Sequence, residues 1–86
     1  MSTYKDWLIL YKWYYGNDEK LPDYLGEEHY HDNFKGNVTM LIRCRQKLNN
    51  EGGLTLEQDS KLIEAILELE LKEAYSIIVG IIKLKQ

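Results

Sequence analysis

This chain of 86 residues contains one cysteine, one proline and two alanines. Because Cys44 is alone, no internal disulfide can form, and packing must hold the fold, as is usual in a reducing compartment. The first residues, M-S-T-Y-K-D-W, lack the charged and then apolar pattern of a secretion signal. The longest apolar run, 77–82 with Gly80 included, is too short to span a bilayer. We therefore expect a soluble cytoplasmic protein with no membrane segment.

The chain also lacks the residue patterns of catalysis, nucleotide binding and metal binding. His29 and His31 are close in sequence, but helical residues two apart point about 200° from each other and cannot share a metal. Cys44 lies on a partly apolar helix face, where it is best interpreted as a small buried hydrophobic residue. The glycine pair 52–53 reads as a loop between helices and not as a phosphate cradle. We expect no enzyme activity, metal or cofactor.

What the chain does contain is helical periodicity. Hydrophobic residues make up 44% and charged residues 29%, which is typical of a soluble globular protein. Apolar residues repeat at helical spacing over about 4–15, 28–49 and 55–84. We predict an all-α fold: a single helical domain over 1–86, built as a small three- to four-helix bundle of antiparallel helices with a long C-terminal helix.

The C-terminal helix begins with a capping box, in which Thr55 is the N-cap and Gln58 the third residue. Unbroken, its 30 residues would measure roughly 45 Å. From Ala74 onward it becomes apolar all round, and such a helix must be buried all round. Either it breaks near 72–76 and its last part becomes the central helix, or it stays straight and a second chain covers it. A strand over 76–82 ranks last, because no partner strand is evident.

The middle helix, 28–49, keeps its periodicity through Gly36, and we predict one continuous helix. The alternative is that Gly36 divides it, with Asn37 capping a second piece. Arg45 and Glu70 each fall within an apolar helix face, although a buried charge must be paired or reach water. One hypothesis is that they pair with each other across a helix contact. The other is that each reaches solvent by itself.

On the first helix, Ile9 and Trp13 lie four residues apart, opposite the face that supplies the core. Either Trp13 packs beneath the 17–22 connection, or it anchors a partner, since Trp and Tyr dominate binding hot spots. These residues and the unusually apolar C-terminus predict a small intracellular protein–protein interaction module, an adaptor or inhibitor, and favour a homodimer. Small acidic chains of this composition are common among accessory proteins of phages and mobile elements. The predicted partner-binding residues are Ile9, Lys12, Trp13, Tyr75, Val79 and Ile82.

Nucleic-acid binding is the alternative function. The charge is arranged in blocks: −4 over 1–34, +4 over 35–50, −5 over 51–75 and +2 over 76–86. The basic block would offer Lys35, Arg43, Gln46 and Lys47 on an exposed helix face, a composition typical of a recognition helix. However, the net charge is −3, so phosphates would be repelled outside this patch. Neutralisation within the fold therefore ranks above nucleic-acid binding.

Overall fold

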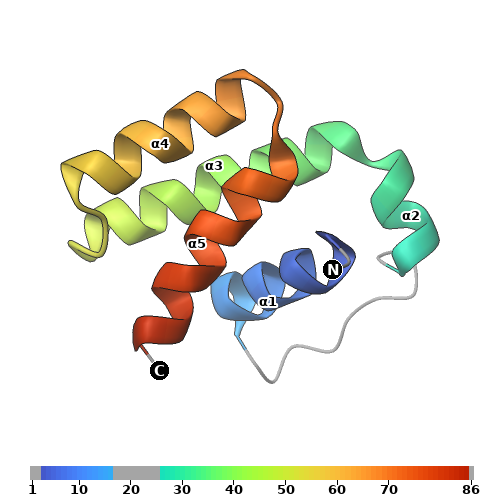
Figure 1. Ribbon diagram of the computed structural model, residues 1–86. Coiled ribbons are helices and arrows are strands. Elements are labelled where there is room, and N and C mark those ends of the chain that lie inside the picture. The colour runs from blue at the N-terminus through green and yellow to red at the C-terminus, as the bar shows by residue number, and fades with distance from the viewer. Residues whose placement is uncertain (1–2, 17–25, 86) are drawn as a thin grey trace.

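The computed structural model describes residues 3–16 and 26–85. Throughout these residues the chain forms helices, turns and short connections, with no strand. The helices, in chain order, are α1 (Thr3–Tyr15), α2 (Glu27–Asp32), α3 (Phe34–Asn50), α4 (Leu56–Leu67) and α5 (Leu71–Lys85) (Figure 1). The predicted all-α class is confirmed. The described helices number five because two of the predicted helices are each divided in two.

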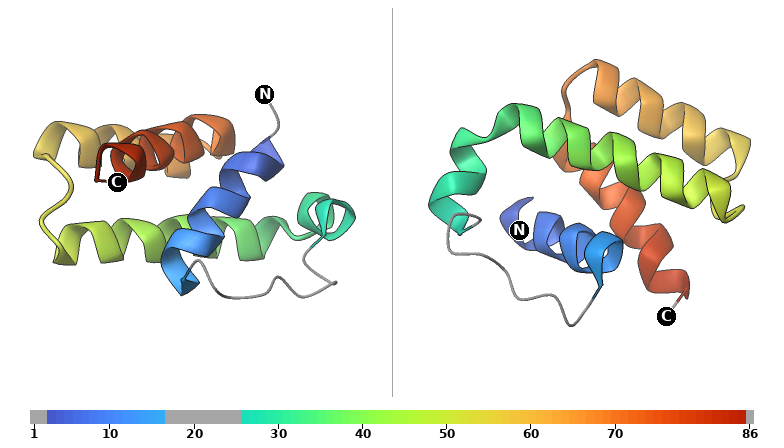
Figure 2. Two further views of the ribbon diagram at one scale, coloured as in Figure 1. Left: turned by 90° about the horizontal axis from the view of Figure 1, so that it is seen from below. Right: turned by 180° about the vertical axis from the view of Figure 1, so that it is seen from behind.

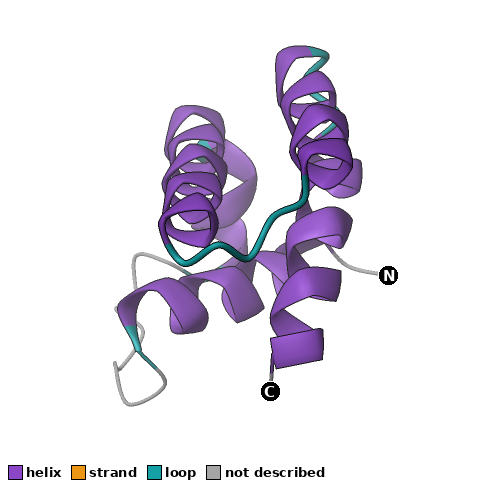
Figure 3. Cartoon of the chain, turned by 90° about the vertical axis from the view of Figure 1, so that its left-hand side faces the viewer, coloured by secondary structure: helices purple, strands orange, loops and turns teal. Residues whose placement is uncertain are grey.

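Helices α3 and α4 run side by side in opposite directions, and α5 follows α4 after a turn and crosses α3 (Figures 1 and 2). Helix α1 packs against α3 and α5. Helix α5 contacts α1, α3 and α4. The connection from α3 to α4 crosses one end of the pair (Figure 3). Helix α5 is therefore the central element, as the broken-helix alternative predicted.

The first division lies at Asn33, which ends α2 and caps α3. Its backbone leaves the helical region, with φ −109° and ψ 57°, and its Oδ1 accepts a hydrogen bond of 3.2 Å from the Gly36 backbone N–H. The prediction of one continuous helix over 28–49 is therefore wrong. The alternative correctly split the segment but misplaced the cap, because Asn37 lies buried inside α3.

The second division lies at 68–70, ahead of the predicted 72–76. An unbroken helix would be roughly 45 Å long, whereas the molecule with this turn has a longest extent of 36 Å. The start of α4 is as predicted. Thr55 Oγ1 accepts from the Gln58 backbone N–H at 3.1 Å, and Gln58 Oε1 accepts from the Thr55 backbone N–H at 3.0 Å.

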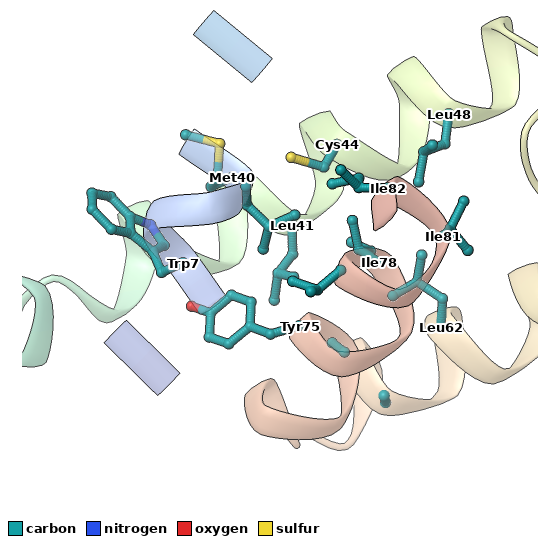
Figure 4. Packing of buried hydrophobic residues seen from close by; sticks show 14 of the residues in the cluster. Trp7, Met40, Leu41, Cys44, Leu48, Leu62, Tyr75, Ile78, Ile81 and Ile82 are labelled. Atoms are coloured by element: carbon teal, nitrogen blue, oxygen red, sulfur yellow. The ribbon is translucent and has the colours of Figure 1, made fainter. Parts of the chain in front are cut away.

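The core is formed mainly by α5, α3 and α1 (Figure 4). Helix α5 supplies Ala74, Tyr75, Ile78, Val79, Ile81 and Ile82, all buried. Its other side is exposed along Lys72, Ser76 and Gly80, which follow one another at helical spacing. The expectation that this segment is buried all round is therefore wrong, and no second chain is needed to cover it.

Arg45 does not pair with Glu70. Its Nε lies 2.6 Å from Asp59 Oδ1 and its Nη2 lies 2.9 Å from Asp59 Oδ2, joining α3 to α4. Glu70 stands in the turn before α5 and is exposed to solvent. The hypothesis of an Arg45–Glu70 pair is wrong because the turn at 68–70 carries Glu70 off the helix face on which periodicity had placed it.

Candidate protein-docking surface at the turn between α4 and α5

The turn between α4 and α5 is a Schellman motif with an unusual residue at its key position. The backbone N–H of Glu70 donates to Ala65 O at 2.9 Å, and that of Leu69 donates to Ile66 O at 3.1 Å. These are the two hydrogen bonds that define the motif, and they require the residue after the C-cap, which donates the second bond, to adopt a left-handed conformation. That residue is Leu69, with φ 59°, the one residue other than glycine at positive φ among those the structure describes.

The end of α3 uses the same motif with the usual residue. There the N–H of Gly53 donates to Leu48 O at 2.8 Å and that of Gly52 donates to Asn49 O at 3.1 Å. Gly52 has φ 70° and incurs no steric penalty, whereas a side chain in this conformation costs roughly 1–2 kcal/mol. The strain at Leu69 is thus a property of the residue present, because a glycine would remove it.

The Leu69 side chain recovers little of this cost through burial. It is 57% exposed, and Leu67, two residues earlier, is 77% exposed. An exposed leucine in a strained conformation contributes little to the stability of the isolated chain. Such strain is concentrated at functional sites, and it points to a role in contact with another molecule.

Shallow hollows lie on both sides of Leu69. One, of about 290 Å³, is lined by Leu69 together with Tyr30, His31, Phe34, Asn37 and Leu71. The other, of about 610 Å³, is lined by Leu69, Glu70, Leu71, Lys72, Glu73 and Ser76. Leu69 and Leu71, which line both hollows, therefore form a ridge between them, and the walls of the first hollow are largely apolar or aromatic.

Carboxylates surround this ridge. Glu64, Glu68, Glu70 and Glu73 are all exposed, and together with Lys61 and Ala65 they line a third hollow of about 230 Å³. Of the nearby lysines, Lys61 already lies 3.4 Å from Glu57 Oε1, and Lys72 offsets one of the four carboxylates. The resulting potential is negative and attracts cationic groups. We call Phe34, Leu67, Leu69, Leu71 and these four glutamates the corner surface.

Asn37 adds a polar group to the first hollow. Its side chain is only 4% exposed, and its Nδ2 donates to the Tyr30 carbonyl at 2.9 Å. Its Oδ1 is buried and accepts no hydrogen bond of good geometry from the residues described. An unpaired buried acceptor costs about 1–3 kcal/mol, so Asn37 lowers the stability of the isolated chain.

Three of the predicted partner-binding residues are elsewhere than expected. Tyr75, Val79 and Ile82 lie in the chain's own core, with exposed fractions of 0%, 6% and 1%. Burial, with the neighbouring Tyr30 hydroxyl second, raises the pKa of Tyr75 far above its usual range. Helical periodicity identified these residues as apolar but could not show that α1 and α3 cover them.

The other three lie on α1. Ile9 and Trp13 are half-buried and pack against the core, while Lys12 is exposed. The Nζ of Lys47 lies 4.3 Å from the centroid of a Trp13 ring and donates to the Trp13 carbonyl at 3.1 Å. One face of Trp13 is thus occupied by a cation from α3. The 17–22 connection, beneath which one alternative placed Trp13, lies outside the described residues.

The residues predicted for nucleic acid are only partly brought together. Arg43, Gln46 and Lys47 share a hollow of about 400 Å³ with Tyr14 and Asn50. Lys35, at the other end of α3, does not line it. Arg43 Nη1 lies 3.5 Å from the Tyr15 hydroxyl, and Lys47 is engaged with Trp13, so both cations already have partners within the fold.

The residues described contain no cluster of three or more potential metal ligands. His31 is exposed with its ring edge-on to Tyr30, while the His29 side chain lies outside the described part of the chain. Cys44 is fully buried, as predicted, and burial raises the pKa of its thiol to about 12. No helix in the described ranges is both long and apolar enough for a bilayer span.

Comparison of the chain with protein-family models, with curated proteins and with solved structures found no match. The surfaces of the chain itself therefore carry the functional proposal.

Proposed function

We propose that the chain is a small helical protein-binding module, an adaptor or inhibitor that acts by docking on another protein through the corner surface. The observation that carries this proposal is Leu69, held at φ 59° and 57% exposed where Gly52 serves the same turn elsewhere in the chain. A leucine that strains its own backbone without being buried contributes little to folding, and its value lies in what it contacts.

The proposal assigns no catalysis to the chain. The corner surface offers apolar side chains within a ring of carboxylates, and this arrangement, with an apolar centre and a polar rim, is typical of docking surfaces. A second copy of the chain is a poor occupant. Two corner surfaces face to face would bring two sets of four carboxylates together, and like charges oppose such an interface.

The test is capture of partners on the immobilised chain, followed by quantitative mass spectrometry. The informative variant carries Leu67→Ser and Leu69→Gly, which removes both exposed leucines of the corner and relieves the strain. The matched control carries Leu56→Ser and Leu84→Ser. These two leucines are still more exposed, at 89% and 85%, but lie at the far ends of α4 and α5.

We expect capture by the parent chain and the control, and at least a ten-fold loss with the corner variant. Circular dichroism should show the corner variant fully helical, so that lost capture reflects the surface and not the fold. Undiminished capture by the corner variant would overturn the proposal, and so would capture that fails equally in the control.

Nucleic-acid binding through Arg43, Gln46 and Lys47 is the second candidate, supported by the hollow that these residues share with Tyr14 and Asn50. It ranks lower because the net charge is −3 and both cations already have partners within the fold. Binding of a fluorescent single-stranded oligonucleotide at 50 mM salt, lost on Arg43→Glu, would favour this candidate over docking.

A further inference from the structure

We propose that the partner segment received by the corner surface is a basic amphipathic helix, whose apolar side chains lie on both sides of Leu69. This inference rests on the proposed function and adds the chemistry of the partner. It follows from two features of the corner: its charge and the two adjoining hollows that share Leu69 and Leu71.

The charge determines the sign of the partner. Glu64, Glu68, Glu70 and Glu73 are exposed at the corner, whereas Lys61 is paired within α4 to Glu57. Lys72, which is exposed and lines the larger hollow, offsets one of these four charges and leaves an excess of carboxylates. A segment with lysines or arginines beside its apolar face would neutralise these carboxylates, and an acidic segment would be repelled. Attraction of this kind also speeds association and weakens as salt is added.

The shape favours a helix. Leu69 lines both the 290 Å³ hollow toward α2 and α3 and the 610 Å³ hollow along α5, so one ridge separates two depressions. Helical residues three or four apart lie side by side on one face, and such a pair can straddle a ridge. A segment that binds by adding a strand would need a sheet edge, and the described residues contain no strand.

The probes are two fluorescein-labelled 18-residue helical peptides with identical leucine positions, one with lysines on its polar face and the other with glutamates. Fluorescence anisotropy at low salt measures their affinity for the parent chain and for two charge variants. The corner charge variant carries Glu68→Lys and Glu70→Lys. The matched control carries Asp6→Lys and Glu51→Lys, which changes the net charge equally on α1 and at the end of α3 and leaves the Lys61–Glu57 pair intact.

We expect the parent chain to bind the basic peptide at least ten-fold more tightly than the acidic one. The corner charge variant should lose this preference, and the control charge variant should keep it. In the ¹⁵N-labelled chain, the Asn37 side-chain amide and the backbone amides of Phe34 and Leu69 should shift on addition of the basic peptide.

Equal affinity for both peptides would overturn the inference. So would an equal loss in the control variant, because the attraction would then be a general effect of net charge. Shifts confined to other surfaces would also overturn it. If capture depends on Leu67 and Leu69 while the peptide preference is absent, the docking function stands and only the basic partner is rejected.

Discussion

Arg45 on α3 donates two parallel hydrogen bonds to Asp59 on α4, from Nε to Oδ1 at 2.6 Å and from Nη2 to Oδ2 at 2.9 Å. The two side chains are 31% and 20% exposed, so water screens this pair less than it does a pair on the open surface. The two-pronged geometry fixes the register of two neighbouring helices. The same hydrogen bonds, more than the charge alone, hold the pKa of Asp59 below its usual range.

We expect Asp59→Asn to lower the free energy of unfolding by about 1 kcal/mol at pH 7. Because the pKa of Asp59 is lowered by folding, the contribution is present above the unfolded value of about 3.9 and is lost as pH falls through the folded value. The difference in the free energy of unfolding between parent and variant, measured by urea titration, should therefore decrease as pH falls below about 4. A gap that is the same at pH 3 and at pH 7 would contradict this assignment.

Two helical glycines should respond differently to substitution by alanine. At Gly80 an added Cβ meets open space, and Gly80→Ala should raise stability by about 1 kcal/mol through helix propensity. At Gly36 an added Cβ would collide with the Asn33 side chain and displace the cap of α3. The propensity gain there should be cancelled by a loss of about 1 kcal/mol from the cap. Urea unfolding of both variants measures the difference, and equal gains would show that the Asn33 cap contributes nothing.

Substitution of Thr55, the N-cap in the capping box of α4, should destabilise the chain more than the same substitution of Thr39. Thr55→Ala removes the acceptor for the Gln58 N–H and should cost about 1 kcal/mol, roughly 4–8 °C in Tm for a domain of this size. Thr39→Ala, in the middle of α3, removes only an exposed bond to the Lys35 carbonyl and should change stability by less than about 0.5 kcal/mol. Thermal unfolding followed by circular dichroism would decide, and equal losses would refute the role of the box.

Cys44 should be unreactive in the folded chain. Its thiol is fully buried, and burial raises its pKa to about 12, with the charge of Lys47 opposing this in part. Iodoacetamide at pH 8 should modify it at least a hundred-fold faster in guanidinium chloride than in buffer. Because folding raises the pKa of the thiol, Cys44 should not lower the free energy of unfolding at a pH below the thiol pKa of the unfolded chain, about 8.5. As pH rises above that pKa, the free energy of unfolding should decrease. Rapid labelling of the native chain would show that α3 opens around Cys44.

The corner surface shows the limit of helical periodicity. The segment 67–71 reads L-E-L-E-L, in which every residue is an adequate helix former, so a continuous helix was the natural prediction. Its strict alternation was the one available signal that the helix fails there, because alternation does not form a helical face. No local rule would have placed a leucine at a left-handed position.

Local chemistry determined from the sequence what depends on neighbours in the chain: the all-α class, the bounds of α1, the capping box at Thr55 and Gln58, and the burial of Cys44. These depend on backbone hydrogen bonds and on which face of a helix is apolar. Only the tertiary structure decided that α5 turns back into the core, that Arg45 meets Asp59 and that Leu69 stands exposed between two hollows. The reason is that a helical wheel shows which side of a helix must be covered but not which other helix covers it.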